Sequence, residues 1–486
     1  MAHPAHEAVR YDPAGEARVA VRAPVRERWS WALYDFANTI FSMNVASLYF
    51  TVWLVEDLRS SNIVFAMASA AASALVVVAI PVLGAISDAR RRRKWWVVGF
   101  TVVACVACAS IGIFGQTTIP VVGKMVVGKM VVGEDLSASS WLPTVSNLKW
   151  MLLAFIIANF SYQAAQPFYN AMLPELVPAQ EQGRLSGIGV AVGYIGSIVG
   201  VLLVVPFFNA ALPFIGPLSD RVMAVLRSIP YAGVGGRVST FVPTALLFFA
   251  FTIPLIVFCR DHDPVGGKAP IQLRQAFNQV ANTLRDARRH PGALRFILTT
   301  FIYQDAVGTI VGFMTLYAVK AVGFGEGTET TLFMALTIPA IFGSYFYGWL
   351  ADRIGPKRSL SITLATWVVL LAAMIGVPGK VGFWLVGIAI GLNFGGVNAA
   401  ERPVLLSLIP DVEAGRYFSL LLLSARAAAI LGPLVWAVTV DGLEAQFGTA
   451  IAYRAAVVTI MVMFGLAWWL LQGVPNKRPG TPAIAS

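Results

Sequence analysis

A few ionisable side chains stand inside long apolar runs of this chain, where they are the first candidates for chemistry. Asp35 lies in the run WALYDFANT and Asp305 in the run IYQDAVGT. An ionised carboxylate is costly in hydrocarbon, so such a residue usually faces a polar cavity. Burial favours its neutral form, so that taking up a proton can be linked to a conformational change. We expect both aspartates to bind a proton or a cationic group; the alternative is that nearby hydroxyl and amide groups hold them in structural roles.

Further polar side chains accompany the two aspartates, and we expect them to line the same cavity. They are the amides and tyrosines Tyr34, Asn38, Asn159, Gln163, Gln166, Tyr303, Gln304, Asn393 and Asn398. Arg426 is a cation within a late apolar run and therefore needs a partner. That partner is either an intramembrane acid, forming a buried ion pair, or the carboxylate of a bound solute.

Residues suited to metal or nucleophilic chemistry are sparse. All four histidines lie outside the apolar runs, and Cys105 and Cys108 form an isolated C-x-x-C without a second pair. Small packing residues explain that pair better than a metal or redox site does. We therefore expect no metal, no cofactor and no enzymatic activity.

The composition indicates where these side chains are held. Hydrophobic residues make up 57% of the 486 positions and charged residues 13%, against roughly 25% charged in a soluble domain. The net charge of +11 is concentrated in short clusters between apolar runs, which is typical of cytoplasmic membrane loops. The composition therefore predicts an integral membrane protein surrounded by lipid, with no nucleic-acid partner.

Twelve apolar runs are long enough to cross a bilayer, since a helix rises 1.5 Å per residue and the hydrocarbon core is ~30 Å thick. The predicted spans are residues 30–55, 61–87, 95–116, 148–172, 185–207, 240–259, 293–319, 329–350, 359–376, 381–402, 417–440 and 450–473. On this topology 25 of the 36 Lys and Arg residues lie in the tails and even-numbered loops, and 10 in the odd-numbered loops. The positive-inside rule therefore places both termini in the cytoplasm.

The spans divide the chain into two bundles of six. We expect a cytoplasmic tail at 1–28, an N-terminal bundle at 29–259, a linker at 260–292, a C-terminal bundle at 293–474 and a second tail at 475–486. The linker contains an amphipathic pattern typical of a helix on the membrane surface, and so does the outward loop around 218–229. The outward loop 117–147 contains a near match to a phosphate-binding loop, which we reject because Met130 replaces the magnesium-binding Ser or Thr.

A duplication relates the two bundles. GAISDARRRRK contains Gly84 and Asp88, and GWLADRIGPKR contains Gly348 and Asp352, 264 residues after Asp88. LPELVPAQEQGRLSG and LIPDVEAGRYFS form a second pair, and the two runs around Asp35 and Asp305 form a third. Three motif pairs in the same order predict two pseudo-symmetric halves.

The glycine–aspartate loops have a physical use. Glycine permits close helix approach, and an aspartate can accept hydrogen bonds from a helix N-terminus or pair with arginine. We predict that Asp352 lies near the start of span 5 and Asp88 near the start of span 11, latching the cytoplasmic side. The alternative is that they are ordinary loop charges. The basic residues assigned to this gate are Arg92, Arg184, Arg353 and Arg416. Span 5 also has a face of glycines, predicted to pack against span 8.

These motifs resemble the signature loops of the major facilitator superfamily. SWALYDFAN (30–38), FYNAMLPELVPAQEQGRLSGIGVAVGYIG (168–196) and AAILGP (428–433) are similar to its vacuole-effluxer-like branch. The resemblance implies an all-α membrane protein with twelve transmembrane helices in two pseudo-symmetric six-helix bundles. It also implies alternating access through a central cavity lined by spans 1, 4, 7 and 10, with amino acids or other small solutes as substrates.

We therefore expect a monomeric, proton-coupled secondary transporter of a small organic solute in a bacterial inner membrane. The alternatives are a lipid or amphiphile flippase and a non-transporting receptor on the same fold.

Overall fold

The computed structural model of the chain describes residues 9–11, 17–19, 22–58, 60, 62–90, 92–118, 147–212, 216–233, 235–261, 292–324, 329–376, 379–410, 413–428 and 431–476. Most of these residues are helical, because a helix satisfies every backbone polar group within its own segment where no water is available. The loop 117–147 and the linker 260–292 fall almost wholly outside the described residues, so the amphipathic helix expected in the linker does too.

The first six predicted spans correspond to helices between residues 25 and 258. The first span is α1 (Val25–Phe41), continued by the π-helical η1 (Ser42–Tyr49), α2 (Phe50–Val52) and η2 (Trp53–Asp57). The next five spans are α3 (Asn62–Arg90), α4 (Arg93–Thr118), α5 (Leu148–Ala171), α7 (Gln182–Asn209) and α9 (Phe241–Phe258). Short helices connect them: α6 (Leu173–Leu176), η3 (Ala179–Glu181), α8 (Asp220–Arg227) and η4 (Arg237–Thr240).

The last six predicted spans correspond to helices between residues 293 and 472. These are α11 (Ala293–Tyr317) with η5 (Ala318–Val322), α12 (Glu329–Ile354), α13 (Pro356–Gly376), α14 (Gly379–Leu408), α15 (Ala414–Ala428), α16 (Leu431–Phe447) and α17 (Thr449–Gln472). Span 11 was predicted as one helix at 417–440, and it corresponds to α15 and α16 together. Span 10 was predicted to end at 402, whereas α14 continues to Leu408 with Pro403 inside it.

Strands are confined to two small antiparallel pairs among the described residues. β1 (Val9–Tyr11) pairs with β2 (Ala17–Val19), with Val9 opposite Val19. β3 (Ala211–Leu212) pairs with β4 (Gly216–Pro217), with Ala211 opposite Pro217. The chain is therefore all-helical in its architecture.

Seven helical stretches of the described residues are long and apolar enough to cross a membrane. They are Arg93–Gln116, Ala179–Phe208, Arg237–Phe258, Ala293–Val311, Pro356–Gly376, Gly379–Leu408 and Thr449–Gln472. Each of them reaches the about 20 residues that a bilayer requires. These helices identify the chain as an integral membrane protein.

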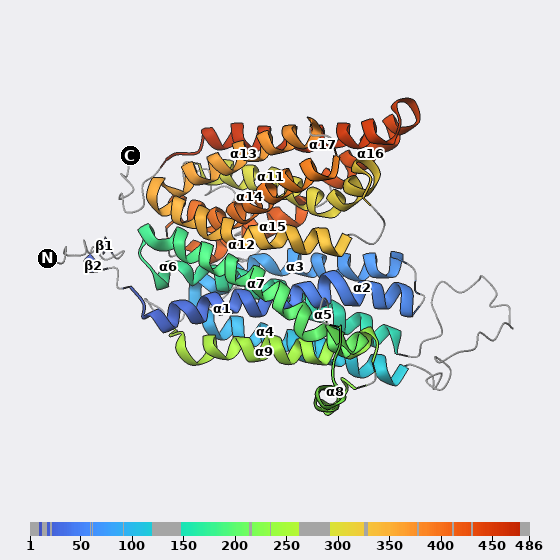
Figure 1. The fold of residues 1–486 in the computed structure, drawn as a ribbon. Coiled ribbons are helices and arrows are strands. Elements are labelled where there is room, and N and C mark those ends of the chain that lie inside the picture. Colours follow the sequence, from blue (N-terminus) through green and yellow to red (C-terminus); the bar gives the residue numbers. More distant parts are fainter. Residues whose placement is uncertain are drawn as a thin grey trace.

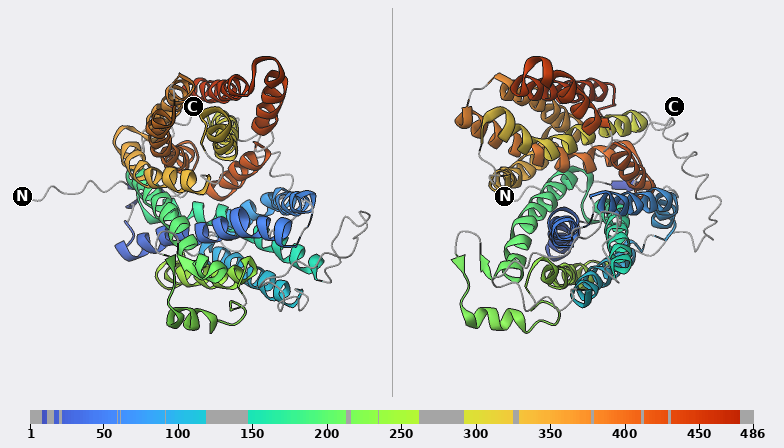
Figure 2. Two further views of the ribbon diagram at one scale, coloured as in Figure 1. Left: turned by 45° about the vertical axis from the view of Figure 1, so that its right-hand side comes forward. Right: turned by 90° about the vertical axis from the view of Figure 1, so that its right-hand side faces the viewer.

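The helices gather in two groups that lie side by side. In Figure 1 the helices up to α9 fill the lower part of the view and those from α11 onward fill the upper part. In both views of Figure 2 the same two groups lie one above the other. We call residues 25–258 the N-terminal half and residues 293–472 the C-terminal half. The halves meet where α7 packs on α12 and α14, and where α15 packs on α3 and α5.

Aromatic stacking fills the interior of each half. In the N-terminal half the rings of Phe50 and Phe155 stack with centroids 3.9 Å apart. In the C-terminal half Trp367 stacks on Phe464 at 4.7 Å. Offset and stacked ring pairs at such distances add about 0.5–1.5 kcal/mol beyond burial alone. These pairs belong to one buried hydrophobic cluster with members in both halves, on which polar side chains of the interface can be positioned.

Candidate functional site

A cavity of about 520 Å³ lies between the two halves. Its walls come from α1, α5 and α7 on one side and from α14 and α15 on the other. Spans 1, 4 and 10 thus contribute as the resemblance implies. Among the described lining residues, α7 and α15 take the place expected for span 7, which is α11. The polar lining residues are Asp35, Asn38, Thr39, Ser42, Tyr162, Gln166, Asn170, Tyr194, Asn398, Glu401 and Arg402.

An ion pair crosses this cavity from one half to the other. Arg402 Nη1 donates to Asp35 Oδ2 at 3.0 Å, and Arg402 Nη2 donates to Asp35 Oδ1 at 3.3 Å. Both side chains are largely buried, with 13% of Arg402 and 10% of Asp35 exposed. A guanidinium that meets both carboxylate oxygens in this way forms a strong and directional pair. The pair therefore joins α1 of the N-terminal half to α14 of the C-terminal half.

Two aromatic rings complete the surroundings of Arg402. Its guanidinium carbon lies 5.6 Å from the ring centre of Trp31 and 5.4 Å from that of Tyr169. Trp31 Nε1 donates to the Tyr169 carbonyl at 3.1 Å, and the Tyr169 hydroxyl donates to the Trp31 carbonyl at 3.1 Å. These reciprocal bonds fix α1 against α5. Rings within about 6 Å attract a cation through their electron-rich faces, so the N-terminal half is shaped to receive this arginine.

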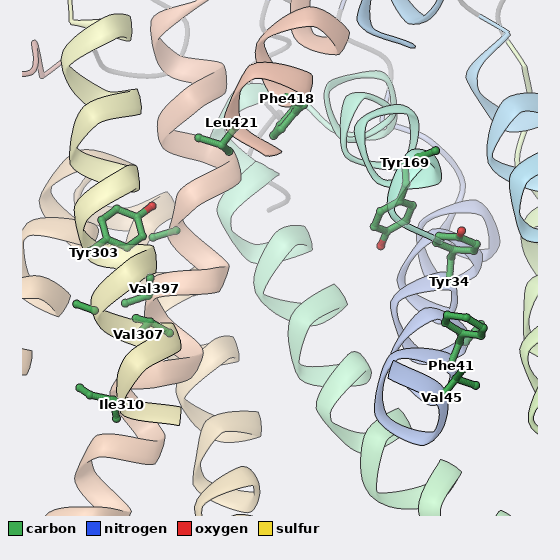
Figure 3. Close-up of a cluster of buried hydrophobic side chains, with 14 of the residues drawn as sticks. Tyr34, Phe41, Val45, Tyr169, Tyr303, Val307, Ile310, Val397, Phe418 and Leu421 are labelled. Carbon is green, nitrogen blue, oxygen red and sulfur yellow. The ribbon is translucent and has the colours of Figure 1, made fainter. Parts of the chain in front are cut away.

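Glu401 precedes Arg402 on α14 and faces a different helix. Its Oε2 atom accepts a hydrogen bond from the Tyr303 hydroxyl at 2.8 Å and another from Gln304 Nε2. Figure 3 shows Tyr303 on α11, on the opposite side of the interface from Tyr34 and Tyr169. Tyr303 and Gln304, which were expected to line the cavity, contact the cavity residue Glu401 instead. Two consecutive residues of α14 thus bond to α11 and to α1.

Asp305 lies away from this cavity, inside the C-terminal half. Its side chain is 1% exposed, and Oδ2 accepts a hydrogen bond from the backbone N–H of Gly432 at 2.7 Å. Gly432 is the second residue of α16, and the first N–H groups of a helix have no partner within it. Asp305 therefore caps α16. Its other oxygen, Oδ1, has no hydrogen-bond partner among the described residues.

The other residues predicted for the cavity divide into two groups. Asn38, Gln166 and Asn398 line it, together with Asp35, and Asn398 also donates to the Tyr194 hydroxyl of α7 at 2.9 Å. The rest bond within their own half: Tyr34 to Thr101, Gln163 to Asn159, and Asn393 to Tyr347 and the Thr363 carbonyl. The periodicity of a helix places these amides on known faces, but it does not say which face meets the other half.

The predicted contact between Asp352 and the start of span 5 is present. Asp352 accepts hydrogen bonds from the backbone N–H groups of Gly183 and Arg184, both at 2.8 Å. A Cβ on Gly348 would lie 2.5 Å from the Gly183 carbonyl oxygen, so both glycines are needed for this approach. At Arg184 the Asp352 carboxylate accepts its hydrogen bond from the backbone N–H, so this contact uses the start of the helix.

The glycine face of span 5 meets two helices. Gly187 packs on α12, where an added Cβ would lie 2.4 Å from the Ser344 carbonyl oxygen, as predicted for span 8. Gly189 and Gly196 instead face α1, and a Cβ on Gly189 would lie 2.7 Å from Asp35 Oδ2. The glycines therefore serve close packing within the N-terminal half as well as between the halves.

The remaining gate residues are placed as follows. The guanidinium of Arg353 lies 5.0 Å from the Trp349 ring centre, and Arg416 forms an ion pair with Glu413. Arg92 is exposed. Gly84 lies within α3, and the structure does not describe the side chains of Asp88 and Arg426.

Four residues of the site were not predicted to lie there: Trp31 and Tyr169 were not singled out, and the sequence reasoning placed Glu401 and Arg402 at the cytoplasmic end of span 10. The predicted end of span 10 at 402 placed the last two at the membrane surface, where charges are ordinary. The helix in fact continues to Leu408, so Glu401 lies seven residues, or about 10 Å, inside its end. Pro403 lies inside this helix, although a proline usually marks a helix end or a kink.

Comparisons with known proteins agree with this architecture. Residues 57–479 match the family described as vacuole effluxer Atg22-like. The chain is 25% identical over 455 residues to YxiO of Bacillus subtilis (strain 168), an uncharacterized MFS-type transporter, covering 92% of this chain and 94% of YxiO.

Two solved structures show the same fold. A bacterial homologue of the iron transporter ferroportin, in its outward-facing state, gives a TM-score of 0.63 at 14% identity and covers 93% of this chain and 99% of its own. FucP, the fucose:proton symporter of E. coli, in its outward conformation gives a TM-score of 0.64 at 13% identity, with 91% and 97% covered. The match over residues 57–479 shows the family: the chain is a membrane transporter of the major facilitator superfamily and belongs to the vacuole effluxer Atg22-like family.

Proposed function

We propose that this chain is a secondary active transporter that moves a small organic solute by alternating access, coupled to protons. Twelve spans in two pseudo-symmetric bundles, 29–259 and 293–474, would carry the cycle. The observation that carries the proposal is the Asp35–Arg402 ion pair, which joins the two halves across a polar cavity. A bond of this kind can form in one arrangement of the halves and break in the other, as alternating access requires.

The cavity suits a small solute with a polar end and an apolar end. Its volume of about 520 Å³ lies within the range of about 300–1,000 Å³ typical of small-molecule sites. Within the part of the chain that the structure describes, the amide oxygens of Asn38 and Asn170 have no hydrogen-bond partner, whereas Phe418 and Leu421 of α15 form an apolar wall. A buried acceptor without a partner costs about 1–3 kcal/mol, so a solute that donates hydrogen bonds would relieve it. Amino acids and similar compounds meet these requirements.

The proposal includes the setting of the protein. It would act as a monomer in a bacterial inner membrane, with lipid around it and both termini in the cytoplasm. The gate would be the contact between Asp352 and the start of α7, repeated by Asp88 at the start of α15. In this setting the gate closes the cytoplasmic side. Asp35, Asp305 and Glu401 are the candidate carboxylates for the coupled proton.

An apolar lateral opening between spans 5 and 8 would favour the alternative of a lipid transporter. In the structure α7 and α12 approach each other backbone to backbone at Gly187 and Ser344. This close packing favours a solute that enters through the aqueous cavity. Flux in reconstituted membranes distinguishes a transporter from a receptor.

The experiment that tests the proposal has two steps. Thermal-shift measurements with a panel of amino acids and related solutes identify a ligand, because binding to the folded state stabilises it. Uptake of that radiolabelled ligand is then measured in proteoliposomes with and without an imposed pH gradient. We expect accumulation that depends on the gradient. Binding without flux would support the receptor alternative and overturn the proposal.

A further inference from the structure

We propose that Glu401 is the carboxylate whose protonation couples the transport cycle to the proton gradient, and that the cavity closes only when this site is neutral. The inference rests on the proposed function and deepens it. It assigns the proton to a residue of span 10 that has no counterpart in the repeated motifs.

The first step is the charge of the cavity. The carboxylate of Asp35 and the guanidinium of Arg402 neutralise each other at 3.0 Å. Glu401 lines the same cavity and accepts its hydrogen bonds from two uncharged donors, Tyr303 and Gln304. Among the described residues that line the cavity these three are the charged ones, so with all three ionised they carry one negative charge in excess.

The second step is the surroundings of Glu401. On its own helix the neighbouring charge is Arg402, which is already bonded to Asp35 of α1. From α11 it meets Tyr303 and Gln304. Of the described residues that line the cavity, α7 contributes Tyr194, and α15 contributes the apolar Phe418 and Leu421.

The third step is the cost of closing the cavity. An excess charge is tolerated while water fills the space, but moving an unpaired ion into a dry, low-dielectric site costs several kcal/mol. A proton taken up from the aqueous cavity by a Glu401 carboxylate oxygen removes the excess charge. The same proton leaves that oxygen when the cavity opens to the other side. Closure is thereby linked to protonation, and no other atom is transferred.

The other two intramembrane carboxylates, Asp35 and Asp305, form interactions that make them poorer proton carriers. Protonating Asp35 would leave the buried Arg402 without its counter-ion. Asp305 caps α16 inside the C-terminal half and is 1% exposed, so no water of the described cavity reaches it directly. Glu401 is the one of the three that faces the cavity while bonded to neutral groups.

A test that needs no substrate follows the accessibility of the cavity. Ala425, which lines it, is replaced by cysteine in a background with Cys105, Cys108 and Cys259 changed to serine. The labelling rate with a membrane-impermeant thiol reagent is measured as the pH is lowered, with Glu401 intact and with Glu401→Gln. Dividing the rate with Glu401 by the rate with Glu401→Gln at each pH removes the pH dependence of thiol ionisation that the two proteins share.

We expect the ratio to fall as the pH is lowered, because the protein with Glu401 closes when protonated whereas Glu401→Gln is neutral at every pH. A ratio that stays constant would overturn the proposal. Glu401→Asp keeps a carboxylate and should restore the pH response if the glutamine variant is poorly folded. Glu444→Gln, an exposed change outside the cavity, should leave the pH response as it is.

Uptake driven by a pH gradient separates the two proposals. If the wild type accumulates radiolabelled solute and Glu401→Gln only exchanges it, both proposals stand. If Glu401→Gln still accumulates solute with the gradient, the inference fails while the proposed transport function stands. If the wild type shows no flux for any ligand it binds, the proposed function itself fails.

Discussion

Asp35 and Asp305 occupy matching places in the repeated first and seventh spans, but they bond to different parts of the molecule. Asp35 reaches across the interface to Arg402, whereas Asp305 caps α16 within its own half. Both have a threonine four residues later that donates to the aspartate's own carbonyl, Thr39 at 2.6 Å and Thr309 at 2.8 Å. The local helix is thus the same, and the difference lies in what faces it.

The reason for the difference is in the tenth span. Aligning Pro174 with Pro410 places Ala165 and Gln166 opposite Glu401 and Arg402. The N-terminal half therefore has no counterpart of the charged pair on α14. The repeat keeps each aspartate at the same position on its helix. The residues of the helix that it faces, which differ between the halves, determine its partner. The account of coupling depends on this asymmetry.

Removing the arginine should have the largest effect. Arg402→Gln leaves the buried Asp35 without its counter-ion, and breaking such a pair from one side costs about 3–5 kcal/mol. We expect a marked loss of thermal stability in detergent and a loss of solute flux. The thermal stability is measured by size-exclusion chromatography of heated samples. Arg402→Lys keeps the charge but not the two-point contact with Asp35, and should lie between. Wild-type stability for Arg402→Gln would contradict the cross-interface role of Asp35.

The interface between α7 and α12 offers a second comparison, because it also joins the halves but through backbone contact. In Gly348→Ala the new Cβ would meet the Gly183 carbonyl oxygen at 2.5 Å. Overpacking of this kind costs about 1–3 kcal/mol. We expect faster labelling of a cysteine placed at Arg184, measured from the cytoplasmic side. Gly308→Ala, where a Cβ meets nothing within 4 Å, is the matched control; equal labelling in the two variants would contradict the latch.

A smaller effect is expected at Asp305. Asp305→Ala removes the acceptor of the Gly432 N–H, and leaving a buried donor without a partner costs about 1–3 kcal/mol. Asp305→Asn keeps an oxygen for that bond and should lose less than about 1 kcal/mol. Both variants should keep gradient-driven uptake. If Asp305→Asn lost proton coupling but kept normal stability, the coupled proton would have to be assigned to the seventh span. The contrast between Asp35 and Asp305 would then be contradicted.

The smallest effect on stability is expected at the cavity amide of α1. Asn38 Oδ1 accepts no hydrogen bond from the residues that the structure describes, so Asn38→Ala should change the unfolding temperature little. It should weaken solute binding by about 1 kcal/mol, or roughly fivefold in Kd, as measured by titration calorimetry. Equal affinity in the variant and the wild type would place the solute elsewhere in the cavity.

The sequence predicted the helices well because their signal is strong. Runs such as 95–116 and 450–473 are continuous and apolar, and they differ from α4 and α17 by a few residues. The partner of Asp352 was also predictable, because a repeated glycine–aspartate loop demands a close helix start. These features depend on local pattern and on duplication.

The site was harder to predict, because its residues are brought together by the interface between the halves. Arg402 and Asp35 are 367 residues apart, and helical periodicity does not specify which faces of α1 and α14 meet. The extension of α14 beyond Pro403 moved Glu401 and Arg402 from the expected surface into the interface. Tertiary packing therefore decided which charged residues are buried together.

A double-mutant cycle tests the central claim most directly. The thermal stability and solute flux of Asp35→Asn, Arg402→Gln and the double variant are compared, with Asp35→Asn and Asp305→Asn as a parallel cycle. We predict a coupling of about 1–3 kcal/mol for the first pair, with the double variant more stable than Arg402→Gln alone. The two aspartate changes should be additive. Additivity of the Asp35 and Arg402 effects within about 0.5 kcal/mol would contradict the account.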